Sequence, residues 1–485
     1  MKSIRENCGI FGLYAQKECV YDIYQGIDFL QHRGQEYCGI STYNQEIDRI
    51  KQIDFLEQQN EEHDSDLSFG KEINHVTHHG KVIDTFTDEE LRILKGYWGI
   101  GHVSLWERQP MKWQTRHGGI AVAFSGNVIN ADELMQEMMD RGKSFYKSYD
   151  IEIISKIVIE EPDTVSGIKA LAKKVKGAYS LVVLSKDGIY ATRDIYGFRP
   201  LMLGKDTERY AVSSESRAIQ NLGMENVRDI GPGEIVLIND RGFQTVGQVH
   251  SPRKAHCAFE WAYTASIDSI IDGVHVQEAR NNMGAQLAQR DIDEGGLDAD
   301  FVAPVPLSGI GHALGYHHRS KIKYQEVFLY HRYADRSYMQ ATQIAREKMA
   351  KRKLSVLHYA VKGKSIILCD DSIVRGTQIM NKVRDLKNAG ARSVHVRIAC
   401  PPLMYPCDFG VSTRSHDELI ARQLINTGDI TSMDQLLEIE AWIANKVGAD
   451  SVKFNTMDAF VSALMIPRKE LCLRCFDGIN PLEDW

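Results

Sequence analysis

The sequence lacks the features of membrane, secreted and nucleic-acid-binding proteins. No apolar run in its 485 residues approaches the roughly 20 residues of a membrane span. Its start, MKSIRENCG, has basic residues but no apolar segment, so we expect no secretory signal. The net charge of −7 gives no reason to expect a nucleic-acid partner. These absences predict a cytoplasmic protein with neither a membrane nor a nucleic acid as its partner.

Cysteine is present, but not in the pattern of a disulfide framework. Nine cysteines, an odd number, are scattered along the chain, which favours a reducing compartment over disulfides. Each is then a core residue, a nucleophile or a metal ligand. The chain also lacks a GxxxxGK[ST] phosphate loop and any internal repeat. At this length we expect two domains rather than one core.

The first half of the chain reads as short strands with a few helices. Its β-rich runs end in turn residues, and its helical segments have apolar residues at helical spacing. The polar stretch 57–80 contains His75, His78 and His79, which could bind a metal, but its composition favours a solvated loop. We predict strands at 119–127, 179–185, 188–194, 209–216 and 233–238, and helices at 131–142 and 165–177.

The second half has a different pattern, which begins after a break near residues 246–256. Apolar strands alternate there with helical segments, and this alternation predicts an α/β domain with a mostly parallel sheet. We place the domains at residues 8–245 and 255–485. The predicted strands of the second domain are 300–306, 325–330, 364–369 and 393–399.

Two adjacent acids follow one of these strands. Asp370 and Asp371 directly follow the apolar run KSIILC. A small hydroxyl-rich turn comes next, and then a helix with Ile379, Val383 and Leu386 on one face. This is a βαβ unit, in which ligands bind at the carboxyl ends of the strands. Backbone N–H groups of the turn and the helix N-terminus suit a phosphate, whereas the acids suit sugar hydroxyls and Mg²⁺. The stretch therefore predicts a site for a phosphorylated sugar that carries further phosphate and a metal.

The same stretch resembles the signature of type I phosphoribosyltransferases for 5-phosphoribosyl 1-diphosphate (PRPP). The alternative is a surface turn with a chance pair of acids. VPLSG (305–309) resembles the family's loop near the metal and points to Ser308, although Leu307 stands where the family usually has an acid. Residues 330–355 resemble the mobile loop that closes over PRPP; the alternative there is a charged helix face. The resemblance implies Mg²⁺ at Ser308, Asp370 and Asp371, and PRPP binding by Asp370, Asp371, Ser372, Ile373, Val374, Arg375, Gly376, Thr377, Arg332, Arg336 and Lys353.

The N-terminal motifs ENCGIFGLY and LQHRGQEYCGI, taken with the PRPP loop, resemble those of the glutamine amidophosphoribosyltransferases over nearly the whole chain. This resemblance implies an α+β N-terminal-nucleophile hydrolase domain with αββα layers, followed by an α/β phosphoribosyltransferase domain. Cys8 would be the glutaminase nucleophile. A free α-amine, with a pKa near 8, can act as general base for its own thiol, whereas an amide cannot. Residues 1–7 are therefore expected to be a propeptide; the alternative is a buried core cysteine.

The glutaminase motifs depart from the family pattern at two positions. Ser104, in GHVSLWERQP, stands where the family has the arginine that holds the glutamine carboxylate. The family's oxyanion run HNGN reads FSGN here, with Ser125, Gly126 and Asn127. Loss of one oxyanion donor costs about 10²–10³ in rate. Arg108 or the Ser125 hydroxyl could replace what is missing, and Asp150 matches the acid that binds the glutamine amine.

Four cysteines of the second domain form a further set. LCLRCFDG contains Cys472 and Cys475 in a CxxC, and Cys257 and Cys407 lie elsewhere in the domain. Four thiolates can hold Zn²⁺ or a [4Fe–4S] cluster, and their spacing does not choose between these. The resemblance implies the [4Fe–4S] cluster, because some members of the family carry one on these four cysteines. Free structural cysteines are the other alternative.

The resemblance as a whole implies the first step of purine synthesis. Glutamine is cleaved at Cys8, and ammonia displaces pyrophosphate from PRPP to give 5-phosphoribosylamine. It also implies purine nucleotide inhibitors and a homo-oligomer, typically a tetramer. Two alternatives remain open at this point. One is an ammonia-dependent phosphoribosyltransferase with an impaired glutaminase site, and the other is a non-catalytic regulator that binds PRPP or nucleotides.

Overall fold

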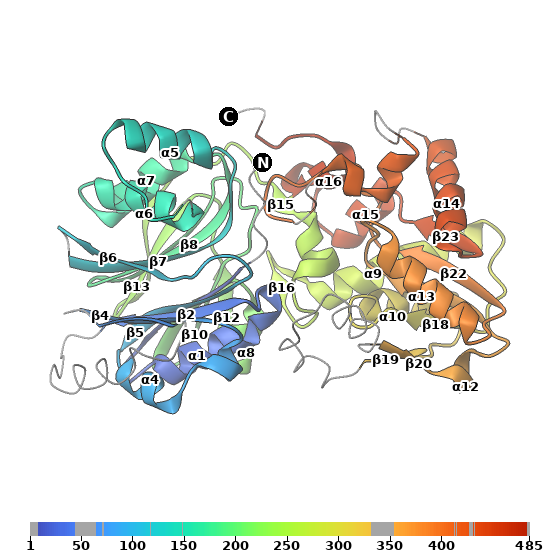
Figure 1. The fold of residues 1–485 in the computed structure, drawn as a ribbon, viewed down its shortest axis with the longest axis horizontal. Coiled ribbons are helices and arrows are strands. Elements are labelled where there is room, and N and C mark those ends of the chain that lie inside the picture. The colour runs from blue at the N-terminus through green and yellow to red at the C-terminus, as the bar shows by residue number, and fades with distance from the viewer. Residues whose placement is uncertain are drawn as a thin grey trace.

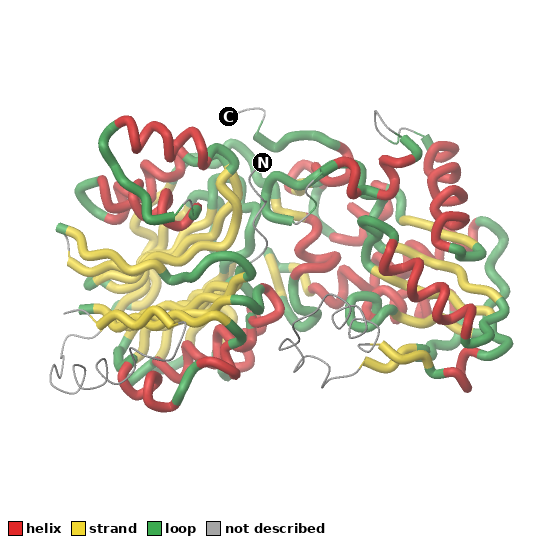
Figure 2. The backbone as a smooth tube through the Cα atoms, viewed as in Figure 1, coloured by secondary structure: helices red, strands yellow, loops and turns green. Residues whose placement is uncertain are grey.

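The structure, a computed structural model, has two domains that lie side by side (Figure 1). The N-terminal domain contains two stacked sheets, and the C-terminal domain contains one main sheet with helices around it (Figure 2). No helix among the described residues is long and apolar enough to cross a bilayer. The structure describes residues 8–43, 65–69, 72–116, 118–147, 149–330, 354–411, 413, 415–425, 430 and 432–482.

The N-terminal domain is a sandwich of two antiparallel sheets. The eight-stranded sheet has the order β12-β10-β11-β1-β5-β2-β4-β3 and the six-stranded sheet the order β14-β13-β9-β8-β7-β6. The strands of the first sheet are β1 (Gly9–Ala15), β2 (Tyr37–Tyr43), β3 (Ser65–Phe69), β4 (Ile73–His79), β5 (Trp98–Ser104), β10 (Met202–Lys205), β11 (Arg209–Ser213) and β12 (Glu225–Asp229). Those of the second are β6 (Met111–Thr115), β7 (Gly118–Val128), β8 (Gly177–Ser185), β9 (Gly188–Arg193), β13 (Glu234–Asn239) and β14 (Gly242–Gln248).

Helices cover both outer faces of this sandwich (Figure 1). Helix α5 buries Ala131, Leu134 and Met138, which are three and four residues apart and so share one face. The αββα layers implied by the family resemblance are confirmed. One face carries α5 (Ala131–Asp140), α6 (Asp150–Glu160) and α7 (Thr164–Lys174), and the other carries α1 (Val20–Phe29), α4 (Asp88–Ile93) and α8 (Ser216–Asn221).

The prediction of an exposed loop over residues 57–80 is wrong at β3 (Ser65–Phe69) and at β4 (Ile73–His79). Residues 73–79 form β4, an inner strand of the eight-stranded sheet, between β2 and β3. Two of its histidines are buried beside polar partners: Ser41 Oγ lies 2.8 Å from His75 Nδ1, and His78 Nε2 lies 3.1 Å from Glu90 Oε1. A buried polar group with a hydrogen-bond partner costs little, so a polar sequence can form an inner strand.

The C-terminal domain is built on a parallel sheet of order β18-β21-β22-β23, as the alternating pattern predicts. Alternate residues of β21 pack on opposite faces of the sheet. Ile366 and Leu368 pack in one core with α13 and α14, and Ile367 packs in another with α9 and α10. The elements are β18 (Phe301–Pro304), β21 (Ser365–Asp370), β22 (Ser393–Ile398), β23 (Ser451–Phe454), α9 (Val276–Asp293), α10 (Ile310–Ser320), α13 (Thr377–Asn388), α14 (Met433–Val447) and α15 (Met457–Leu464).

One predicted strand of this domain lies outside the main sheet. Within 325–330 only Phe328–Tyr330 forms a strand, β19, and it pairs antiparallel with β20 (Leu354–Val356) in a separate ribbon. Its short apolar run is the same signal as that of a buried parallel strand, so the sequence pattern does not separate the two.

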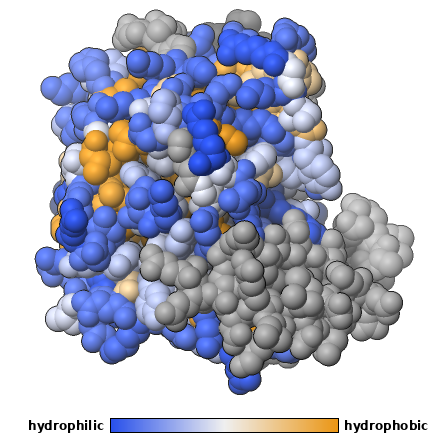
Figure 3. Space-filling view, turned by 90° about the vertical axis from the view of Figure 1, so that its left-hand side faces the viewer, coloured by the Kyte–Doolittle hydropathy of each residue, from blue (hydrophilic) through white to orange (hydrophobic). Residues whose placement is uncertain are grey.

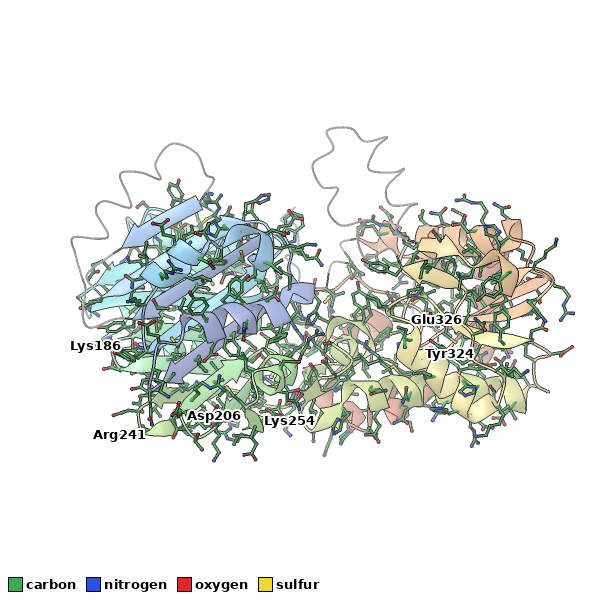
Figure 4. All side chains as sticks on the ribbon, turned by 90° about the horizontal axis from the view of Figure 1, so that it is seen from below. Lys186, Asp206, Arg241, Lys254, Tyr324 and Glu326 are labelled. Atoms are coloured by element: carbon green, nitrogen blue, oxygen red, sulfur yellow. The ribbon has the colours of Figure 1, made fainter. Side chains whose placement is uncertain are left out.

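The two domains meet through a buried ionic bridge. Glu260 of the C-terminal domain accepts hydrogen bonds from Arg33 and Arg199 of the N-terminal domain, each at 2.7 Å. All three side chains are at most 2% exposed. The chain crosses between the domains near Lys254, with Asp206 on one domain and Tyr324 on the other (Figure 4).

Hydrophobic side chains gather inside the domains. Ile100, Val182 and Val212 belong to the core between the two sheets and are fully buried. The outer end of the N-terminal domain is mainly hydrophilic over its described surface (Figure 3). Burial of these apolar surfaces holds the sheets in place and so fixes the loops at their edges.

Candidate functional site

The acid pair lies at the carboxyl end of β21, as the sequence predicts for Asp370 and Asp371. Both carboxylates are held by short hydrogen bonds. Ser308 Oγ donates to Asp370 Oδ1 at 2.7 Å, and Ser372 Oγ donates to Asp371 Oδ2 at 2.6 Å. The Asp371 N–H also donates to Asp370 Oδ1, at 3.1 Å. The structure therefore brings Ser308 to the acid pair from a distant part of the sequence.

Burial and the neighbouring charge of Asp370 raise the pKa of Asp371 to about 8. Without a cation, ionising both of these adjacent carboxyl groups costs free energy, because the two negative charges repel each other. The donor set of two carboxylates and a hydroxyl has the hard oxygen chemistry that Mg²⁺ prefers. These residues therefore fit a magnesium ion that takes its further ligands from a substrate. In the described ranges, no three His, Cys, Asp or Glu side chains lie together as a set that could hold a metal without a substrate.

The loop after the acid pair borders a pocket of about 890 Å³. Residues 372–377 all line it, and α13 begins at Thr377 directly after Gly376. Gly376 has φ +79°, a left-handed conformation that a residue with a side chain adopts only at a cost. The backbone N–H groups at this helix start suit an anion such as a phosphate.

The predicted binding residues of the loop differ in how free they are to bind a ligand. The Arg375 side chain is 63% exposed, and its Nη2 lies 2.7 Å from Glu418 Oε1. Arg375 therefore forms an ion pair with Glu418 at the rim of the pocket. Ile373 is buried. Arg332, Arg336 and Lys353 lie outside the described residues, and their role as a lid stays a prediction.

Cys8 directly precedes strand β1, an inner strand of the eight-stranded sheet, and has 9% of its surface exposed. The Ser125 hydroxyl donates to the Cys8 carbonyl oxygen at 2.8 Å and accepts from the Cys8 N–H at 3.3 Å. β7 thus places the FSGN run beside the predicted nucleophile. Gly126 has φ +155°, and a Cβ there would lie 1.8 Å from the Ala178 carbonyl oxygen, so this position requires glycine.

Asp150 starts α6 and is fully buried. Its Oδ2 accepts the Val128 N–H at 3.0 Å, one residue after Asn127. The Asn127 side chain donates to the Asp408 carbonyl oxygen of the other domain at 2.8 Å. Cys8, Gly126, Asn127 and Asp150 are therefore connected through β7, although the binding role of each stays a prediction.

Ser104, which stands where the family pattern has an arginine, belongs to a buried hydrogen-bond network. Ser104 is buried, and its hydroxyl donates to the Glu107 carbonyl oxygen at 2.5 Å. The Glu107 carboxylate accepts the Asp150 N–H at 3.1 Å and is itself 3% exposed. Gln109 Oε1 accepts the Phe124 N–H at 2.8 Å. Arg108 lies with its guanidinium carbon 5.9 Å from the Tyr37 ring centre.

The four cysteines of the predicted cluster set, Cys257, Cys407, Cys472 and Cys475, are all buried. The other three lie near enough to Cys475 to raise its pKa. Cys257 and Cys472 are register partners in a short parallel pair of strands, β15 (His256–Cys257) and β24 (Leu471–Cys472). The Cys475 thiol and the N–H groups of Val411 and Phe409 hydrogen-bond Cys407 and lower its pKa. N–H donors of this kind surround thiolates that bind a metal or cluster. The chemistry of the donor set fits a cluster, and its identity stays a prediction.

One loop connects the two sites. Asp408 accepts the hydrogen bond from Asn127, and the Phe409 carbonyl oxygen accepts one from Arg199 at 2.9 Å. A few residues later, Val411 and Thr413 line the pocket at the acid pair. The loop thus touches β7 of one domain and the pocket at the acid pair of the other.

Sequence reasoning missed several polar residues of these sites. Glu107 and Gln109 lie within the quoted run GHVSLWERQP, but no motif gives them a role. Lys382 follows Ile379 by three residues on α13, so helical periodicity alone places it near the pocket side of the helix. Glu260 carries no local signal, because its arginine partners come from the other domain.

Comparison with known proteins agrees with this two-domain arrangement. Residues 103–221 match the glutamine amidotransferase domain family. The amidophosphoribosyltransferase of Methanocaldococcus jannaschii is 35% identical over 98% of this chain and 98% of its own length. That of Bacillus subtilis is 32% identical over 100% of this chain and 96% of its own length. The fold is similar to the solved glutamine PRPP amidotransferase of Bacillus subtilis, complexed with ADP and GMP, at a TM-score of 0.84 and 31% identity over 99% of this chain and 98% of that one.

The two-domain fold, the acid pair at the sheet edge and the nearly full-length similarity all lead to one assignment. The chain belongs to the amidophosphoribosyltransferase family.

Proposed function

We propose that the protein transfers an amino group to PRPP, giving 5-phosphoribosylamine and pyrophosphate, the first step of purine synthesis. The observation that carries this proposal is the acid pair Asp370–Asp371 above a phosphate-binding turn in one pocket. A non-catalytic PRPP-binding protein would use the same cation site, so turnover is the property that separates it from an enzyme.

In this proposal, the acid pair and the loop after it bind different parts of PRPP. The 5′-phosphate binds the N–H groups of 372–377 at the start of α13. Asp370 and Asp371 bind the ribose hydroxyls, and with Ser308 they hold Mg²⁺, which neutralises the leaving pyrophosphate when it is bound. The C1–O bond to pyrophosphate breaks as ammonia forms the C1–N bond, and the ammonium product loses one proton. Arg332, Arg336 and Lys353 are proposed to cover the pyrophosphate and exclude water.

Glutamine is the proposed source of the ammonia. The Cys8 thiol attacks the side-chain amide, a thioester forms and ammonia leaves; water then releases glutamate. Gly126 N–H and the FSGN side chains are the proposed oxyanion donors, and Asp150 is the proposed partner of the glutamine amine. This step needs a free amine at Cys8 and therefore removal of residues 1–7. The intact mass of the purified protein tests that removal.

A second function is favoured by the network around Ser104. A carboxylate, Glu107, lies beside Asp150, and Ser104 stands where the family pattern has arginine. An extra buried acid disfavours the α-carboxylate of glutamine, since like charges repel in a shielded site. The alternative function is therefore the same transfer to PRPP with free ammonia as the nitrogen source.

One assay separates the two functions. Pyrophosphate release from PRPP is measured with glutamine and then with ammonium, for the protein and for its Cys8→Ala variant. Turnover with glutamine that Cys8→Ala abolishes, while ammonium turnover persists, supports the glutamine-dependent enzyme. Turnover with ammonium alone supports the alternative. The absence of turnover with both nitrogen sources would exclude both and favour a PRPP-binding regulator.

Further parts of the proposal concern cofactor, regulation and assembly. We propose that Cys257, Cys407, Cys472 and Cys475 hold a [4Fe–4S] cluster, which would tie together three segments of the second domain; iron and sulfide analysis of anaerobically purified protein tests this. We also propose inhibition by purine nucleotides, since the related Bacillus subtilis structure contains ADP and GMP. A cytoplasmic homotetramer is proposed from the family resemblance, and light scattering measures its mass.

A further inference from the structure

A lysine reaches the acid pair from helix α13. Lys382 lies in the second turn of this helix and lines the same pocket. Its Nζ lies 3.5 Å from Asp370 Oδ2. The two side chains are 15% and 8% exposed, respectively. Because little water reaches this ion pair, its attraction is screened less than that of a surface pair.

The other groups that contact the acid pair are neutral. Asp370 Oδ1 accepts from the Ser308 hydroxyl and the Asp371 N–H, and Asp371 Oδ2 accepts from the Ser372 hydroxyl. Arg280 is a buried guanidinium whose charge acts on Asp371, but its N–H groups donate to the carbonyl oxygens of Trp261, Tyr263 and Ala265. Hydroxyl and amide donors stabilise the carboxylates without neutralising them.

The basic side chains that line the pocket, within the part of the chain that the structure describes, are Lys382 and Arg375. Arg375 is 63% exposed and pairs with Glu418, so it lies at the rim. Lys382 is 15% exposed and pairs with one of the two acids. Among the described side chains that line this pocket, Lys382 is therefore the shielded positive charge.

We propose that Lys382 is a resident counter-cation of the acid pair and sets how strongly sugar-phosphate binding depends on the divalent metal. This inference rests on the proposed function. In the metal-free protein, the ammonium group holds Asp370 and lowers the repulsion between the acid pair and an incoming phosphate. When a divalent ion arrives, it competes with the same ammonium group for Asp370. Lys382 is thus a positioning residue with opposite effects on the two ligands.

The opposite effects give a signature that general damage to the site does not produce. Replacing Lys382 by methionine removes the charge and keeps most of the apolar length. We expect Mn²⁺ alone, followed by electron paramagnetic resonance, to bind Lys382→Met about three- to tenfold more tightly than the unsubstituted protein. Ribose 5-phosphate, titrated calorimetrically in the presence of EDTA, should bind about three- to tenfold more weakly.

Two further variants complete the test. Lys387→Met is the matched control, because Lys387 lies on the same helix but pairs with Asp450 outside the pocket; it should change neither affinity. Lys382→Arg keeps the charge and should keep the metal-free affinity for ribose 5-phosphate within about twofold. If Lys382→Met fails to fold, Lys382→Gln takes its place with the same expected signs.

The outcomes separate this inference from the proposed function. If both affinities fall together, or neither changes, in a folded Lys382 variant while the unsubstituted protein binds PRPP with Mg²⁺, the role of Lys382 is overturned and the proposed function stands. If the unsubstituted protein does not bind PRPP in the presence of Mg²⁺, the proposed function itself is overturned.

Discussion

The Ser125 hydroxyl is expected to hold the nucleophilic residue in place. It donates to the Cys8 carbonyl oxygen at 2.8 Å, which directs its lone pairs toward the Cys8 nitrogen at 3.3 Å. In Ser125→Ala both buried partners lose a hydrogen bond, at a cost of about 1–3 kcal/mol in stability. After removal of residues 1–7 that nitrogen is the general base, so its misplacement should lower the glutamine-dependent rate by about 10- to 100-fold.

The assay is pyrophosphate release with glutamine and with ammonium, together with thermal unfolding. The ammonium-dependent rate of Ser125→Ala should stay within about twofold, because ammonia bypasses Cys8. Ser180→Ala is the matched control: Ser180 is the register partner of Ser125 on β8, is equally buried and bonds the Arg199 and Pro200 carbonyl oxygens instead. An equal loss with both nitrogen sources, or no loss with glutamine, would refute the reasoning.

Two further predictions concern stability. Glu260→Gln should lower the free energy of unfolding by about 3–5 kcal/mol, since Arg33 and Arg199 would lose a buried charged partner; a change below about 1 kcal/mol in urea unfolding would contradict the bridge. For metal-free protein in EDTA, the raised pKa of Asp371, about 8, means that the folded state keeps a proton that the unfolded state has released. Stability should therefore fall as pH rises from about 4 to about 8, and Asp371→Asn should flatten that fall in Tm. An unchanged slope in the variant would count against the buried acid.

The sequence predicts the local parts of this fold well and the long-range parts poorly. β21, the acid pair and α13 follow one another in the chain, so apolar run, turn and helix spacing are enough to place them. Strands β7, β8 and β13 are also read correctly from short β-rich runs ended by turn residues. In contrast, β4 is polar, and its burial depends on partners such as Ser41 and Glu90 that only the folded chain supplies.

In the candidate site, too, the sequence predicts local features better than contacts between distant segments. Motif resemblance leads to Cys8 and Ser308, and the structure places Ser308 at the acid pair. Glu260 and the Asn127–Asp408 contact lie between domains, where neither periodicity nor a local motif carries information. Lys382 has no motif of its own, and only its distance to Asp370 gives it a role.

The most direct test measures the affinity of the protein for PRPP in the presence of Mg²⁺, before and after both acids are replaced. Calorimetry on Asp370→Ala/Asp371→Ala should show PRPP binding weakened by at least about 100-fold, because two charge-assisted contacts and the metal site are lost together. An unchanged dissociation constant in a folded double variant would contradict the account.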